Sequence, residues 1–188
     1  FNGNKIITAG GGGMILTDDE KLAEKARYLT TQAKDDPIRY VHNEIGYNYR
    51  LTNIQAAMGV AQLERLPEYL TRKREIFNKY QIATDNVDGL NIADVPVYAE
   101  NNHWMIILQI DKNIYCDDRE GLMKRLDENE IQSRPVWKSN HKQNPYSDCE
   151  IFRIERAEEL VEKSLCLPSS FNLSENQIRK VIKFLSNG

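Results

Sequence analysis

The chain has 188 residues, of which 40% are hydrophobic and 28% are charged, and its formal net charge at pH 7 is -3. This length and balance fit a globular protein of one domain, or of two unequal parts, with a hydrophobic core. The acidic balance disfavours a nucleic-acid-binding surface, and the apolar runs are too short for a membrane-spanning helix. The three cysteines are widely spaced, which favours a reducing, cytoplasmic setting.

The first third of the chain is predicted to contain strands, a helix and a long loop. Residues 5–8 and 14–17 are expected to form short strands on either side of the glycine run 10–13. Asp18 is expected to cap a helix whose apolar residues share one face. Residues 34–49 show no regular hydrophobic period, so they are expected to form a long ordered loop.

A strong helix is predicted after this loop. Thr52 and Gln55 match the capping box, in which two side chains satisfy N–H groups at a helix start. Pro67 is expected to kink or end this helix, and a second helical run follows it. A domain boundary is placed at this proline, so that residues 1–66 form one part and residues 67–188 the other.

The second part is predicted to be a compact α/β unit. Residues 103–110 and 131–137 are expected to be strands, and the apolar centre of the first suits burial on both faces. Three helices are expected. The first begins after a capping box at Asp117 and Glu120, the second spans residues 149–163, and the third begins after a capping box at Ser174 and Gln177.

Lys5 lies among small and apolar residues just before the four glycines. Most lysines are solvated surface residues, and this glycine run lacks the spacing of a P-loop or a dinucleotide fingerprint, so it suits a turn. A buried lysine, in contrast, holds a neutral amine more readily and is a good nucleophile toward carbonyl groups. The residues alone leave both interpretations open.

Two further segments combine polar and aromatic groups. Asn48 and Arg50 directly precede the helix start at Thr52, an arrangement that suits a bound anion as well as an ordinary capped loop. Residues 134–146 mix basic, aromatic and amide side chains, which suits a sugar or a nucleotide diphosphate but also a plain surface connection. No metal-ligand cluster, carboxylate pair or serine–histidine–aspartate arrangement is recognisable.

These segments, in this order, resemble the C-terminal half of the DegT/DnrJ/StrS-type sugar-nucleotide aminotransferases, which use pyridoxal 5'-phosphate. The resemblance is carried by FNGNKIITAGGGGMILTDD, HNEIGYNYRLTNIQAAMGVAQLERL, RPVWKSNHKQNPY and LCLPSSFNLSENQIRKVIKFL. It implies an α/β chain with the aspartate-aminotransferase-like fold, fold type I. Residues 1–66 would end the cofactor-binding large domain, and residues 67–188 would form the small C-terminal α/β domain.

The resemblance also implies roles for individual residues. Lys5 matches the lysine that binds pyridoxal phosphate covalently and later transfers protons. Asn48 matches the asparagine of the G-x-N-x-R segment, which reaches the cofactor phosphate of the neighbouring subunit in a homodimer, and Arg50 is its companion. The implied substrate-lining residues are His42, Tyr47, Arg134, Trp137, His141 and Tyr146.

The function that the resemblance implies is amino transfer, with glutamate as donor, to a 4-keto-6-deoxy sugar nucleotide. The stretches NHWMIILQID, RPVWK and LPSSFNL most resemble the branch that aminates 4-keto-6-deoxy-N-acetylhexosamine nucleotides for bacillosamine or legionaminic acid synthesis. The upstream half of the family is absent from these residues, so the chain is expected not to complete an active site alone. One alternative is therefore a non-catalytic piece for dimerisation or nucleotide binding. Another is a related dehydratase, which Lys5 disfavours because those relatives carry histidine there.

Overall fold

The computed structural model describes residues 1–186, and the chain divides into two compact units, Phe1–Pro67 and Glu68–Gly188. This division falls beside Pro67. The assignment of the two units to the large and the small domain of a cofactor-binding enzyme stays a prediction. Among the described residues, no helix is both long enough and apolar enough to cross a membrane.

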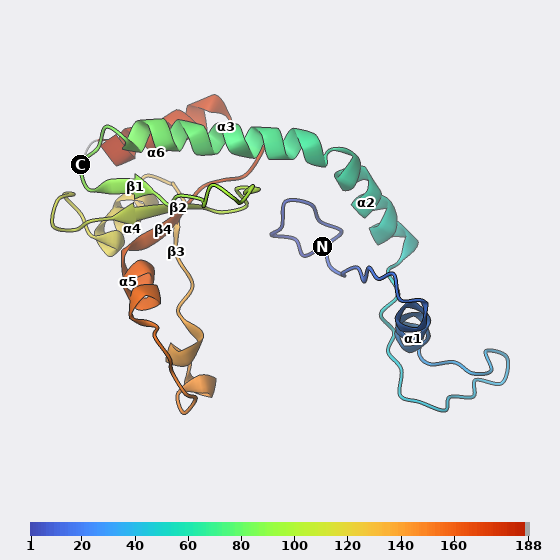
Figure 1. Cartoon of the computed structure of the whole chain (residues 1–188). Coiled ribbons are helices and arrows are strands. Elements are labelled where there is room, and N and C mark those ends of the chain that lie inside the picture. The colour runs from blue at the N-terminus through green and yellow to red at the C-terminus, as the bar shows by residue number, and fades with distance from the viewer. Residues whose placement is uncertain (187–188) are drawn as a thin grey trace. The chain divides into compact units, whose positions relative to one another are not determined.

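Unit 1 contains two helices joined by a long irregular loop (Figure 1). The helices are α1, Glu20–Thr30, and α2, Asn53–Glu64. The side chain of Asp19, not of Asp18, accepts the Leu22 N–H at the start of α1, so this helix begins one residue later than expected. The capping box of Thr52 and Gln55 at the start of α2 is present as predicted.

The two strands expected around the glycine run do not form. Residues 5–8 curl locally, and the Ala9 N–H bonds to the Phe1 carbonyl at 3.1 Å. Residues 14–17 are irregular. A strand is stable where a neighbouring strand takes its backbone hydrogen bonds, and the described part of unit 1 places none beside either segment.

Unit 1 buries little apolar surface. Neither of its helices contains a buried residue, and the apolar face predicted for α1 is only half-buried, at Ala23, Ala26 and Leu29. Met14, Ile15 and Leu16 are also exposed. Because apolar burial is the main stabilising term of folding, the hydrophobic stabilisation of the described chain comes chiefly from unit 2.

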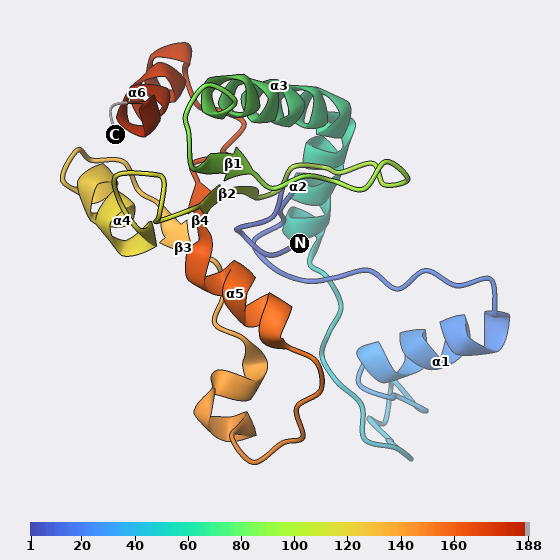
Figure 2. The same cartoon turned by 60° about the vertical axis from the view of Figure 1, so that its left-hand side comes forward.

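Unit 2 is built on a four-stranded antiparallel sheet with the strand order β1-β2-β4-β3 (Figures 1 and 2). Its helices are α3 Leu66–Thr84, which begins just before the unit boundary, α4 Arg119–Asp127, α5 Glu155–Lys163, α6 Glu175–Ser186, and the short 3-10 helices η1 Asn140–Lys142 and η2 Asn144–Tyr146. Its strands are β1 Leu90–Ile92, β2 Ile106–Ile110, β3 Arg134–Pro135 and β4 Ser164–Leu167.

The hydrophobic core of unit 2 joins the sheet to α3, α4 and α6. Fully buried members are Ile76, Leu108, Leu122, Leu165 and Leu185. Helix α6 faces this core with Ile178, Val181 and Leu185, which are its buried residues. Helix α5 contacts β2, contributes no buried residue to this core and continues directly into β4.

Three elements of unit 2 are shorter than the sequence predicts, and one strand was not predicted. The strand expected over 103–110 begins only at Ile106. The strand expected over 131–137 is only Arg134–Pro135 long, and Pro135 has no N–H with which to extend the ladder. The helix expected over 149–163 begins only at Glu155. Strand β1 was not predicted, because three residues are too few to show a hydrophobic period.

The capping box expected at Asp117 is wrong by one residue. Asp118 is the N-cap of α4, and its side chain accepts the Gly121 N–H at 2.8 Å. Asp117 pairs instead with Arg125 at 3.0 Å. Two adjacent aspartates carry the same cap signal, so the sequence pattern does not choose between them.

Candidate active site

Lys5 is exposed in the turn-rich segment that precedes the glycine run. Its backbone N–H bonds to the Asn2 carbonyl at 3.1 Å. Thr8 fixes the backbone further along, because its hydroxyl donates to the Phe1 carbonyl at 3.0 Å and accepts the Gly10 N–H at 2.9 Å. The buried setting that would favour a neutral amine is therefore not formed by the described residues of unit 1.

The glycine run meets the second predicted segment at Gly12. This residue has a φ of +83°, and a Cβ there would lie 2.6 Å from Cδ1 of Leu51. The positive φ favours glycine, whereas the close contact is with the tip of a leucine side chain that can move aside. The segment that carries Lys5 is thereby packed against the residue that follows Arg50.

An open cavity of about 1030 Å³ in unit 1 surrounds this contact. Its walls come from the end of the glycine run, from α1 and from the start of α2, and its polar lining includes Asn48 and Arg50. An arginine beside an amide and a helix start is a donor set that suits phosphate. The structure thus brings the end of the glycine run, the Asn48–Arg50 pair and the start of α2 to one cavity. Lys5 is not among the residues that line it.

The loop that carries Asn48 is held against the end of α1 by backbone hydrogen bonds. The Tyr47 N–H bonds to the Leu29 carbonyl at 2.7 Å. Just before it, a Cβ on Gly46 would lie 2.3 Å from the backbone nitrogen of Ala33. The glycine of the G-x-N-x-R segment is therefore required by close backbone approach.

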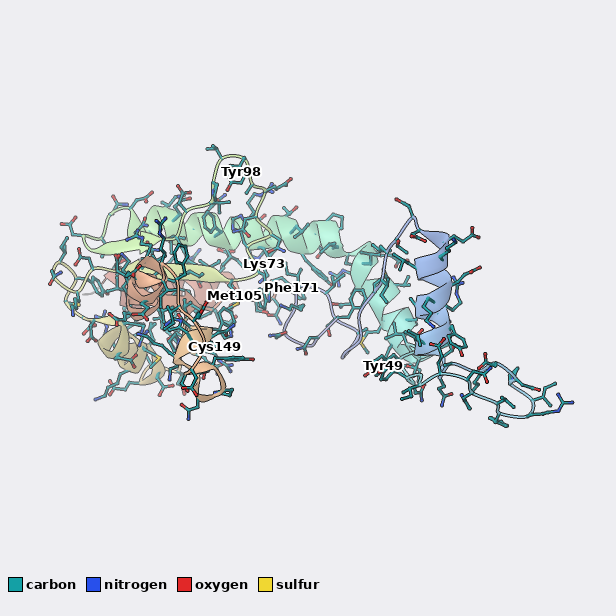
Figure 3. All side chains as sticks on the ribbon, turned by 60° about the horizontal axis from the view of Figure 1, so that its bottom comes forward. Tyr49, Lys73, Tyr98, Met105, Cys149 and Phe171 are labelled. Carbon is teal, nitrogen blue, oxygen red and sulfur yellow. The ribbon has the colours of Figure 1, made fainter. Side chains whose placement is uncertain are left out.

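His42 and Tyr47 are exposed and do not line the cavity. Nδ1 of His42 lies 2.7 Å from the Gln32 carbonyl oxygen, which places the imidazole against the backbone after α1. Tyr47 stacks on Tyr49 with ring centroids 5.1 Å apart, and Tyr49 is labelled in Figure 3. The substrate-lining function of His42 and Tyr47 stays a prediction.

The predicted substrate residues of unit 2 lie along the stretch from β3 to η2, which extends away from the sheet (Figures 1 and 2). Arg134 is exposed on β3, and Tyr146 is exposed on η2. Trp137 is 60% exposed and stacks on Trp104, with ring centroids 6.1 Å apart. His141 lies on η1 and is half-buried.

Sequence reasoning missed Lys73, a buried lysine on α3 that is labelled in Figure 3. Its ammonium donates to the Trp104 carbonyl at 3.1 Å and to the Ser169 carbonyl at 2.5 Å, and burial lowers its pKa to about 8. The sequence does contain a signal, because Lys73 falls on the same buried helix stripe as Tyr69 and Ile76.

His103 was missed as well, although it is only 8% exposed. It has a φ of +49°, stacks on Phe77 with ring centroids 4.2 Å apart, and leaves Nδ1 without a hydrogen bond among the described residues. Burial and the nearby charges of Arg74 and Lys73 lower its pKa. The imidazole is therefore neutral at and above pH 7 in the folded chain.

The chain belongs to the DegT/DnrJ/EryC1/StrS aminotransferase family, whose model matches residues 1–186. EpsN of Bacillus subtilis (strain 168), which is named as a pyridoxal phosphate-dependent aminotransferase, is 41% identical over 192 residues, covering 98% of this chain and 48% of that protein. A GDP-perosamine synthase of Caulobacter vibrioides is 37% identical, covering 98% of this chain and 50% of that protein. The chain thus spans about half the length of the curated relatives it matches.

Solved structures with the same fold include an aminotransferase. TlmJ of Streptoalloteichus hindustanus matches with a TM-score of 0.86 and 26% identity, over 97% of this chain and 48% of that one. DesI, solved in the presence of its TDP-sugar product, matches with a TM-score of 0.84 and 27% identity, over 97% of this chain and 46% of that one. The α/β fold expected from the sequence, fold type I, is confirmed.

Proposed function

We propose that the chain is the lysine-bearing and C-terminal part of a pyridoxal-phosphate-dependent sugar-nucleotide aminotransferase. The observation that carries the proposal is the cavity of unit 1 at which Asn48 and Arg50 lie beside the capped start of α2. Membership of the aminotransferase family supports it. The activity belongs to the full-length protein, because the relatives are about twice as long as this chain.

The residues of unit 1 fit the phosphate end of this cofactor. Arg50 offers a planar guanidinium, Asn48 an amide N–H, and α2 the positive end of its helix dipole, all at one cavity. Pyridoxal phosphate, when bound, supplies the electron sink that makes amino transfer feasible. In the neutral form, Nζ of Lys5 accepts a proton from the carbon beside the transferred amino group and later returns it.

A second copy of the chain is the proposed partner at the loop between α1 and α2. Large apolar side chains are exposed along this loop, namely Ile38, Tyr40, Ile45 and Tyr49. Exposed apolar groups gathered on one segment favour a protein interface. We place Asn48 and Arg50 at the cofactor phosphate of the partner subunit, with His42 and Tyr47 on the shared border.

The proposed acceptor is a 4-keto-6-deoxy sugar nucleotide, specifically the N-acetylhexosamine kind, and the proposed donor is glutamate. Arg134, Trp137, His141 and Tyr146 supply the cationic, stacking and hydrogen-bonding groups that such a ligand requires. Names of relatives support the class, since one is a GDP-perosamine synthase and a solved neighbour was analysed in the presence of its TDP-sugar product. These two carriers differ, so the base of the nucleotide is left open.

Replacing Lys5 by alanine in the full-length protein is expected to abolish the visible absorbance band of covalently held pyridoxal phosphate. It should also reduce amino transfer by at least about a thousandfold, because the amine that binds the cofactor and moves the proton is lost. Titration with pyridoxal phosphate, followed by spectrophotometry and borohydride reduction with peptide mass mapping, measures the first effect directly.

Lys21→Ala serves as the matched control, since it removes another exposed lysine, from α1. This variant should keep the band and the activity. If the wild type shows no band that Lys5→Ala removes, or if reduction labels another lysine instead, the proposed function of Lys5 is wrong. Activity assays with 4-keto sugar nucleotides on different carriers then identify the acceptor.

A further inference from the structure

Glu158 is the anchor of the segment that carries His141. Its carboxylate accepts a hydrogen bond from Nε2 of His141 at 2.7 Å through one oxygen, and the other oxygen lies 3.1 Å from Nζ of Lys142. His141 and Lys142 are neighbours on η1, whereas Glu158 lies on α5. One side chain therefore holds two successive residues of the segment.

No other polar contact among the described residues ties residues 138–148 to the rest of the chain. Their remaining hydrogen bonds are local, such as the Gln143 N–H to the Asn140 carbonyl at 2.9 Å. Neither η1 nor η2 contains a buried residue, so apolar packing contributes little. The position of this segment consequently depends on the Glu158 carboxylate.

The support behind Glu158 is rigid. Helix α5 continues directly into β4, and all four residues of that strand are buried. β4 pairs with β2 on one side and with β3 on the other, at the centre of the sheet. The position of a side chain on the first turns of α5 is therefore fixed relative to the core. A segment that is hydrogen-bonded to this side chain is fixed relative to the core as well.

The carboxylate also determines which imidazole nitrogen carries hydrogen. Hydrogen bonds from His141 and then Lys142 lower the pKa of Glu158, so the group is ionised and accepts hydrogen bonds without donating them. Nε2 of His141 must then bear the hydrogen in the neutral imidazole. Nδ1, which makes no hydrogen bond to a described residue, is left with a lone pair.

We propose that Glu158 is a positioning residue that holds His141 in the Nε2–H tautomer and presents Nδ1 as an acceptor to a hydroxyl or amide N–H of the sugar. This inference rests on the proposed function insofar as the ligand is a sugar nucleotide. It is distinct from that function because the Glu158–His141 pair exists in the chain without ligand. Lys142, held by the same carboxylate, stands beside the imidazole as a cation.

The test compares Glu158→Gln with wild type in the full-length protein. Glutamine keeps the size of the side chain but loses the charge, and its amide nitrogen cannot accept a hydrogen bond. The first readout is the rate at which diethylpyrocarbonate modifies His141, followed by peptide mass spectrometry without substrate. We expect this rate to rise about fivefold to tenfold, because the lost charge-assisted bond frees the ring.

The second readout is the dependence of amino transfer on the concentration of the 4-keto sugar nucleotide. A positioning residue predicts that Glu158→Gln raises KM about tenfold, while kcat changes less than about threefold. Glu162→Gln, an exposed glutamate on the next turn of α5, should change neither readout. Glu158→Asp keeps the charge but shortens the reach, so it should shift both readouts in the same direction and replaces the glutamine variant if that one does not fold.

An unchanged modification rate of His141 in the Glu158 variants overturns the positioning claim, whatever the activity. A faster modification with unchanged KM overturns the claim that Nδ1 meets the sugar. If the full-length protein aminates no sugar nucleotide at all, the proposed function fails, and the modification rates still decide whether Glu158 positions His141. The two failures are therefore distinguishable.

Discussion

Replacing Gly46 by alanine is expected to release the loop between α1 and α2. A Cβ at this position would lie 2.3 Å from the backbone nitrogen of Ala33 and equally close to the carbonyl carbon of Gln32. These are backbone atoms and cannot move aside as a side chain tip can. The backbone segment at Gly46 must therefore separate from the one at residues 32–33. The expected cost is about 2 to 3 kcal/mol.

The separation would break the hydrogen bonds that hold the segment of Asn48 and Arg50, the proposed phosphate-binding residues. The Tyr47 and Tyr49 N–H groups bond to carbonyls of α1 at 2.7 and 3.0 Å, and Asn48 lies between them. Hydrogen exchange of the full-length protein measures this directly. The amides of Tyr47 and Tyr49 should exchange about a hundredfold faster in Gly46→Ala, and affinity for pyridoxal phosphate should fall with them.

The control for this prediction is Gly59→Ala in α2. A Cβ there would meet only the Ala9 Cβ at 3.8 Å, an ordinary contact, and alanine favours a helix. This variant should leave both tyrosine amides protected. Equal protection of these amides in Gly46→Ala and wild type would show that the close approach at Ala33 is not what requires glycine.

Gly46 also illustrates what the sequence could predict about the site. Local chemistry makes Asn48 and Arg50 candidates for an anion site, because an amide, a guanidinium and a capped helix start lie within a few positions of one another. The contacts of Gly46 with Ala33 and of Gly12 with Leu51 join positions 13 and 39 residues apart in the chain. A single sequence gives no measure of such distances, so the reason for each glycine came from the structure.

The same distinction holds for the fold. The capping box of Ser174 and Gln177 is confirmed, with the Ser174 N–H bonded to Oε1 of Gln177 at 2.8 Å, because both partners lie in one helical turn. The strand expected over 14–17 is wrong because a strand depends on a neighbour elsewhere in the chain. Helices that begin with local signals are therefore more predictable than strands.

Glu158 shows that a sequence does not reveal which charged side chains pair with each other. Helix α5 contains four glutamates, at positions 155, 158, 159 and 162. Only the structure shows that position 158 faces His141, while Glu159 pairs with Arg156 and Lys163 on the helix surface. The charge pattern of the helix alone therefore does not show which glutamate holds η1.

The free energy of unfolding of the wild type, relative to Lys73→Met, is expected to rise by about 3 kcal/mol between pH 7 and pH 10.5. Lys73 is 5% exposed, and burial lowers its pKa from 10.5 to about 8. Between these two values the unfolded chain binds more protons than the folded chain, so the stability conferred by this residue increases as the pH rises.

Below pH 8 the buried ammonium is charged in both states, and its desolvation penalty is constant. The two carbonyls of Trp104 and Ser169 compensate it only in part, since neither carries a full negative charge. His103, whose pKa is lowered, is present in both proteins, so most of its contribution to the slope cancels in their difference. Methionine fills a similar volume without a titrating group, so the difference between the two proteins isolates Lys73.

Denaturant unfolding of full-length wild type and Lys73→Met at several pH values between 7 and 10.5 provides the measurement. Lys183→Met on α6 is the control, because that lysine is exposed and its removal relieves no desolvation. The stability difference for this control should stay flat. A flat difference for Lys73→Met as well would mean that the ammonium is hydrated in solution, and that the bridge from α3 to Trp104 and Ser169 is not a buried one.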